Sequence, residues 1–65
     1  MSGTESDPDA DRKAVFAAVV MAQDDGFSVE KARSLVARRF GMTESDVKAI
    51  EREGLNKVWP PLGDA

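Results

Sequence analysis

The segment Phe-Gly-Met-Thr at residues 40–43 joins two stretches in which apolar residues recur at helical spacing. Two helices that cross steeply at a short turn need a small side chain where their backbones approach. They also need a residue that adopts a positive φ at little cost where the first helix ends. Ala37 and Gly41 meet these needs, and Val47 and Ile50 continue the apolar spacing beyond the turn. The spacing therefore predicts a helix-turn-helix.

Length and composition exclude several classes of protein. Sixty-five residues make one small domain, which buries only about 60% of its unfolded surface. The chain has no Cys and no His, so it lacks disulfides, thiolate or imidazole metal ligands and the commonest general base. We therefore expect no enzymatic activity, no metal and no cofactor.

The distribution of apolar residues also bears on location. No apolar run approaches the roughly 20 residues of a membrane span, and the first residues are acidic, whereas a signal peptide begins with basic residues. We expect a soluble, cytoplasmic protein with no membrane partner.

Charge is spread unevenly along the chain. Residues 1–27 carry six acids against two bases, a net charge of −4, whereas residues 28–59 carry seven bases against five acids, a net charge of +2. Asp64 completes the total of −3. The predicted helix-turn-helix is thus mildly basic within an acidic protein, which is a weak electrostatic signal for nucleic-acid binding.

The predicted fold class is all-α, a small three-helix bundle that contains the helix-turn-helix, with an extended Trp-Pro-Pro-Leu segment packed on it. The predicted organisation is a disordered tail at 1–6, a single helical domain at 7–62 with helices at 8–24, 28–40 and 43–53, and a second tail at 63–65.

Capping signals support the three helix starts. Asp7 is a suitable N-cap, and Pro8 fits the first helical position. Ser28 can cap the second helix. Thr43 with Asp46 three residues later forms a variant of the capping box at the start of the third helix. The last of these is the best-specified boundary in the sequence.

The end of the third helix and the segment after it allow two interpretations. Gly54 is expected to end the helix, with Leu55 folding back onto Ile50, and the two prolines that follow predict an extended chain. Trp59 and Leu62 either cover an open side of the core or form an exposed docking site for a protein partner.

The apolar residues at helical spacing define the predicted core, and Met21 is assigned to the surface. The predicted core residues are Val15, Phe16, Val19, Val20, Phe27, Leu35, Val36, Phe40, Val47, Ile50, Leu55 and Trp59.

Residues 40–58 resemble the second half of the helix-turn-helix in region 4 of bacterial sigma factors. The resemblance covers less than a third of the chain. It implies that the third helix enters the major groove of DNA. The residues that match the family pattern in register are Gly41, Thr43, Val47, Ile50, Glu51, Leu55 and Lys57.

The predicted DNA contacts are divided between the third helix and the basic residues around it. Lys57 is a further candidate for a phosphate contact. The predicted DNA-binding residues are Thr43, Ser45, Lys48 and Arg52 toward the groove, with Arg38 and Arg39 on phosphates.

Two departures from the sigma-factor pattern leave a second function open. Glu44 and Asp46 stand where that family has arginines that face DNA. The chain is thus predicted to be a small transcription-associated protein that contacts DNA weakly, alone or in a complex. The alternative is a protein-interaction adaptor or antiactivator that acts on a transcription factor or RNA polymerase without binding DNA. The oligomeric state is open.

Overall fold

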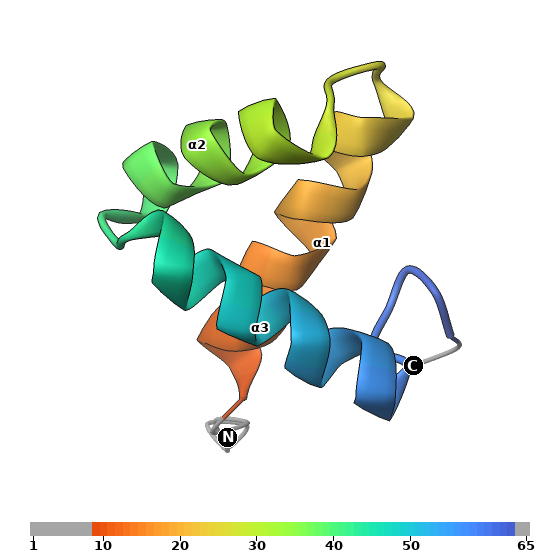
Figure 1. Cartoon of the computed structure of the whole chain (residues 1–65). Coiled ribbons are helices and arrows are strands. Elements are labelled where there is room, and N and C mark those ends of the chain that lie inside the picture. Colours follow the sequence, from red (N-terminus) through yellow and green to blue (C-terminus); the bar gives the residue numbers. More distant parts are fainter. Residues whose placement is uncertain (1–8, 64–65) are drawn as a thin grey trace, which may run out of the picture.

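A computed structural model describes residues 9–63, which form three helices and no strand. Helix α1 spans Ala10–Asp24, α2 spans Val29–Phe40 and α3 spans Glu44–Lys57. Each helix packs against the other two (Figure 1). The predicted all-α class and the three-helix bundle are therefore confirmed, while the predicted tail at 1–6 lies outside the described residues.

Helix α1 begins two residues later than predicted. Its first residue is Ala10, and its N-cap is Asp9, whose side chain makes no capping hydrogen bond. The predicted cap Asp7 and Pro8 lie outside the described residues.

The other two helix starts have the predicted caps. The Ser28 hydroxyl accepts a hydrogen bond of 3.1 Å from the backbone N–H of Lys31. At the start of α3, the Thr43 hydroxyl accepts from the Asp46 N–H at 3.0 Å, and the Asp46 carboxylate accepts from the Thr43 N–H at 3.4 Å. This reciprocal pair is a capping box, which satisfies backbone donors that the first turn of a helix leaves without partners.

Glycines with positive φ end the first two helices. Gly26 has φ 106° and Gly41 has φ 68°. The residue after each glycine donates its backbone N–H back into the last turn, from Phe27 to the Ala22 carbonyl and from Met42 to the Ala37 carbonyl. These bonds supply partners for carbonyls that a helix end would otherwise leave unpaired.

The prediction that Gly54 ends α3 is wrong, because the helix continues to Lys57. Gly54 is buried and faces α1, where a Cβ atom at this position would lie 2.2 Å from Cδ1 of Phe16. The glycine is thus a point of close approach between two helices. The predicted contact of Leu55 with Ile50 does not bury Leu55, whose side chain is 60% exposed.

The last turn of α3 ends at Val58, which has φ 52°. The N–H of Trp59 donates to the Gly54 carbonyl at 3.0 Å, and the N–H of Val58 donates to the Leu55 carbonyl at 3.4 Å. This is the Schellman pattern, with a β-branched residue where glycine is usual. Such a residue is strained in the left-handed region.

Replacing Val58 by glycine is expected to raise the free energy of unfolding by about 1 kcal/mol, because the strain of the left-handed conformation is removed. The Val58 side chain is 54% exposed, so little buried surface is lost. Urea denaturation followed by circular dichroism would measure the change. A Val58→Ala variant keeps a Cβ, so it should recover little of the gain, and a glycine variant less stable than wild type would contradict the prediction.

The core lies between the three helices and is made mostly of small and medium side chains. Two alanines, Ala32 and Ala37, are buried although they were not predicted in the core. The buried core residues are Val15, Phe16, Val19, Ala32, Val36, Ala37, Val47, Ile50 and Trp59.

Four predicted core residues lie at the surface instead. The exposed fractions are 43% for Phe27, 37% for Leu35, 37% for Phe40 and 60% for Leu55. Val20 is partly buried against the core, and Met21 is exposed as predicted. The alanines explain the difference for α2, since small side chains let helices approach closely and leave larger neighbours at the rim of the contact.

The segment after α3 folds onto the bundle as a turn. The prediction of an extended chain is wrong, because the N–H of Leu62 donates to the Trp59 carbonyl at 3.0 Å around a cis Pro60–Pro61 peptide. Trp59 is only 5% exposed. Its ring meets that of Phe16 edge-on, with centroids 6.2 Å apart and planes at 79°.

Candidate nucleic-acid interface on α3

One face of α3 points away from the bundle and is basic. Ser45, Lys48 and Arg52 are three and four residues apart, so they follow one another along a single stripe of the helix, and all three are exposed. The opposite stripe carries Val47 and Ile50, which are buried. Within residues 9–63, neither Lys48 nor Arg52 forms an ion pair or a side-chain hydrogen bond. We call the exposed stripe the α3 face.

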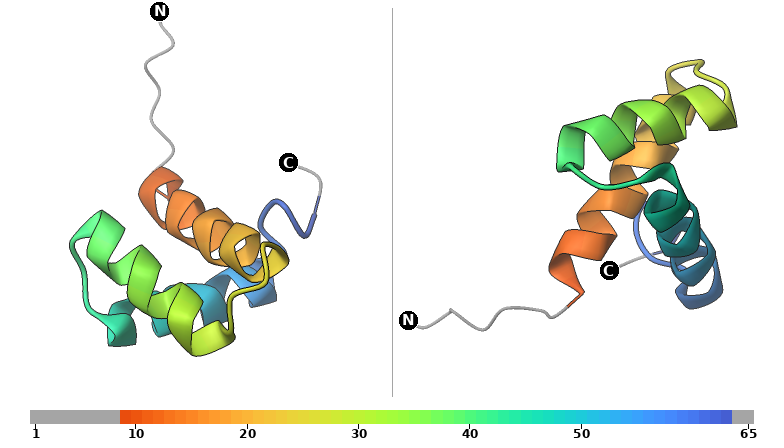
Figure 2. Two further views of the ribbon diagram at one scale, coloured as in Figure 1. Left: turned by 90° about the horizontal axis from the view of Figure 1, so that it is seen from above. Right: turned by 60° about the vertical axis from the view of Figure 1, so that its left-hand side comes forward.

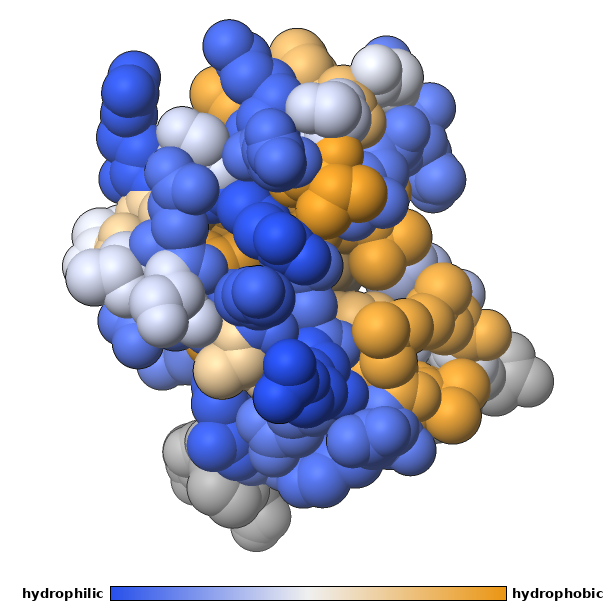
Figure 3. Space-filling model, in the orientation of Figure 1, coloured by the Kyte–Doolittle hydropathy of each residue, from blue (hydrophilic) through white to orange (hydrophobic). Residues whose placement is uncertain are grey.

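Three of the four acidic residues of α3 have partners, and the fourth, Glu44, lies on the stripe itself, four residues before Lys48. Asp46 is turned back to the backbone of Thr43 in the capping box. The Thr43 hydroxyl accepts one hydrogen bond in this cap, so its O–H group can still donate a hydrogen bond outward. Figure 3 shows that the surface over α3 is mainly hydrophilic on the side turned to the viewer.

Glu51 joins α3 to α2 through Arg33. The Arg33 Nε lies 2.6 Å from Glu51 Oε2, and a second guanidinium nitrogen donates to Oε1 at 3.3 Å. The hydrogen bond to Glu51 is the main cause that raises the pKa of Arg33, and the charges of Glu51, Glu30 and Glu44 act in the same direction. The bidentate geometry fixes the orientation of one helix on the other.

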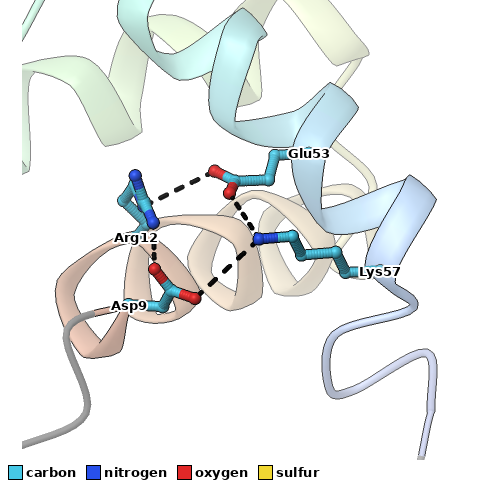
Figure 4. Close-up of polar contacts among 4 residues, drawn as sticks. All are labelled: Asp9, Arg12, Glu53 and Lys57. Carbon is cyan, nitrogen blue, oxygen red and sulfur yellow. Dashed lines mark hydrogen bonds and ion pairs between the residues drawn. The ribbon is translucent and has the colours of Figure 1, made fainter.

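Glu53 belongs to a cluster of four charged residues that joins the start of α1 to the end of α3 (Figure 4). Its carboxylate lies 3.4 Å from Arg12 Nε and 2.9 Å from Lys57 Nζ. Asp9 pairs with Arg12 and lies 4.0 Å from Lys57. Because the Arg12 and Lys57 side chains are about half exposed, each pair contributes little stability by itself.

The predicted phosphate contacts fall in different places. Arg38 and Arg39 are exposed in the last turn of α2. Arg39 lies over the ring of Phe40, with its guanidinium carbon 5.6 Å from the ring centroid, and lines a groove to which α3 contributes no residue. Lys57 is held by Glu53 and lies 5.6 Å from the centroid of the Trp59 ring. The structure thus groups Ser45, Lys48 and Arg52, and separates Arg39 from them.

The two predicted partner-binding residues differ in exposure. Trp59 is buried against Phe16, whereas Leu62 is 49% exposed. Burial of the indole favours the interpretation in which Trp59 covers the core. Only Leu62 of the pair remains accessible to a partner.

A shallow groove of about 330 Å³ runs beside Leu62 and was not predicted from the sequence. All three helices contribute to it, with Val20, Val29 and Leu55 among its apolar residues and the Arg33–Glu51 pair at its edge. Figure 3 shows hydrophobic surface gathered over the end of α3 and the segment that follows. The sequence feature that could have indicated this groove is the pair of apolar residues Val29 and Leu55. Helical spacing placed Leu55 in the predicted core instead.

Neither a candidate metal site nor a membrane-spanning helix is found among the described residues. Residues 9–63 contain no group of three or more acidic side chains placed to hold a metal ion. None of the helices in this range has the length and hydropathy needed to span a membrane. Searches against known protein families, curated proteins and solved structures find no match for this chain.

Proposed function

We propose that this chain is a small helix-turn-helix protein associated with transcription, which contacts DNA weakly through the α3 face. The observation that carries the proposal is the exposed stripe of Ser45, Lys48 and Arg52, whose two positive charges outnumber the single acid on the same face, Glu44, four residues before Lys48. Side chains of this kind at this spacing reach base edges and phosphates when a helix lies in the major groove.

The positions of the acidic residues support the same proposal. Asp46 departs from the sigma-factor pattern, but its carboxylate serves the capping box. Glu51 and Glu53 are neutralised by partners on α2 and α1. Glu44 is thus the acid on α3 for which neither a cap nor an ion pair is found among residues 9–63.

The affinity should be low. Two or three phosphate contacts give a shallow dependence on salt and weak non-specific binding. Tight binding at one site would then need a second DNA-binding element on a partner, which raises the effective concentration of α3 at the DNA. RNA polymerase or a transcription factor would supply it.

Nitrogen-15 NMR titration with a mixed-sequence DNA duplex at low salt, repeated at higher salt, tests this function. We expect salt-sensitive shifts over residues 43–52. A Lys48→Gln, Arg52→Gln double variant should lower the slope of log affinity against log salt by about 2, since each phosphate contact contributes about 0.9. Fluorescence anisotropy of a labelled duplex would measure that slope.

Lys31→Gln is the matched control, because it removes one exposed positive charge from the first turn of α2. It should change the salt slope much less than the α3 variant does. If the folded wild-type protein gives no shifts at low salt, the α3 face does not bind DNA and the proposal fails.

The second candidate function is a protein-interaction adaptor on the same scaffold. The apolar groove beside Leu62 favours it, because an exposed cluster of Val29, Leu55 and Leu62 next to an ion pair suits an amphipathic helix of a partner. Absence of DNA binding together with loss of partner binding on Leu55→Asp would select this function.

A further inference from the structure

The groove between α1 and α2 is an apolar surface that the proposed function leaves unused. It has a volume of about 540 Å³. Four large side chains stand exposed along it, namely Met21, Phe27, Leu35 and Phe40. Contiguous apolar surface of this kind on a small protein marks an interaction site.

Large side chains stand at both ends of the groove. Met21 and Phe27 are exposed near the α1–α2 connection, and Phe40 is exposed at the end of α2, near the start of α1. Alanines of α1, among them Ala14 and Ala17, line the groove toward the same end as Phe40. Figure 2 (left) shows that α1 and α2 run side by side in roughly opposite directions, with α3 behind them. The groove therefore has an exposed aromatic side chain at each end.

Charge differs between the two ends. Asp25 lines the groove at the α1–α2 connection, and Arg39 lines it at the far end of α2. Both side chains are exposed. Within residues 9–63, neither of them forms an ion pair.

The difference in charge makes the groove complementary to itself. A two-fold axis through its middle, near Leu35, exchanges the ends, so the end with Phe27 in one copy meets the end with Phe40 in the other. The same operation places Asp25 of each copy at the end that carries Arg39 in the other.

We propose that the α1–α2 groove is a homodimer interface in which a second copy of this chain lies across it about that two-fold axis, with Asp25 of each copy facing Arg39 of the other. Because α3 contributes no residue to the groove, the dimer leaves the α3 face exposed in both copies. The proposal therefore stands independently of DNA binding.

Charge reversal tests this arrangement. Arg39→Glu alone would place two acids opposite each other at both ends of a dimer, and Asp25→Arg alone would place two bases there. Each single variant should raise the dimer dissociation constant at least about tenfold, since like charges in contact at an interface are strongly unfavourable. An equal mixture of the two variants restores opposite charges at both ends and should dimerise at least as well as wild type.

Sedimentation velocity at increasing protein concentration would measure the association of the wild type, each variant and the mixture. Circular dichroism checks that each variant is folded, and Arg52→Glu on the α3 face is the control that should leave association unchanged. Dimerisation of the wild type and of the mixture, but not of either variant alone, supports the proposal. A wild type that stays monomeric at millimolar concentration, or a mixture that fails to recover association, overturns it.

Discussion

Replacing Gly54 by alanine is expected to destabilise the protein by about 1 to 3 kcal/mol, although alanine is the better helix former. The added Cβ would meet Cδ1, Cε1 and Cγ of Phe16 at 2.2 to 2.6 Å. The Phe16 ring cannot move aside easily, because it is 2% exposed and packs edge-on against Trp59. α1 and α3 would have to separate. Thermal and urea denaturation followed by circular dichroism would measure the loss.

Two further variants isolate the steric cause. Ala49→Gly, at an exposed position of the same helix, measures the helix preference alone and should cost about 1 kcal/mol. In a Phe16→Leu background, the cost of Gly54→Ala should fall by at least about 1 kcal/mol, since residues in contact show coupling of this size. An alanine variant as stable as wild type would show that the two helices are not in close contact here.

The local boundaries were predictable because each depends on a few adjacent residues. Ser28, Gly41 and the pair Thr43 and Asp46 act through hydrogen bonds and backbone angles within one turn of helix. Gly54 gives the same local signal as Gly41, a glycine followed by an apolar residue. Gly41 ends a helix, whereas Gly54 lies inside one because the Phe16 ring packs against it. That contact joins residues far apart in the sequence.

The edges of the core could not be predicted for a similar reason. The apolar residues of α2 cover a broad arc, so spacing alone does not tell which side of the arc faces the other helices. The structure buries Ala32 and Val36 and leaves Leu35 and Phe40 at the rim. This displacement exposes the α1–α2 groove, which a prediction that placed Phe27, Leu35 and Phe40 inside had to miss.

The α3 face was predictable as a set of residues, but its electrostatic surroundings were not. Ser45, Lys48 and Arg52 share a face by spacing alone. The pairing of Arg33 with Glu51, eighteen residues away, depends on how two helices cross. From the sequence, Glu44 and Asp46 counted against DNA binding; the structure gives Asp46 a partner in the capping box, whereas Glu44 stays exposed four residues before Lys48.

Trp59→Ala is the second substitution with a large expected effect, a loss of about 3 to 5 kcal/mol of stability. The indole is buried beyond the end of α3 against Phe16 of α1, so truncation leaves a cavity beside Phe16. A chain of this length is expected to have a stability of only about 3 to 10 kcal/mol, so much of the variant should be unfolded at room temperature. Circular dichroism would show the loss of helix.

The controls for Trp59 separate a structural role from a docking role. Leu62→Ala changes the other apolar residue of the segment, which is 49% exposed, and should cost less than about 1 kcal/mol. Trp59→Phe keeps an aromatic ring beside Phe16 and should fall between the alanine variant and wild type. Since the chain has a single tryptophan, its fluorescence in the wild type reports on this contact directly and should change together with the helix signal on unfolding. A Trp59→Ala protein with wild-type stability would contradict burial of the indole in the core. It would favour the alternative interpretation, in which Trp59 is an exposed docking site for a partner.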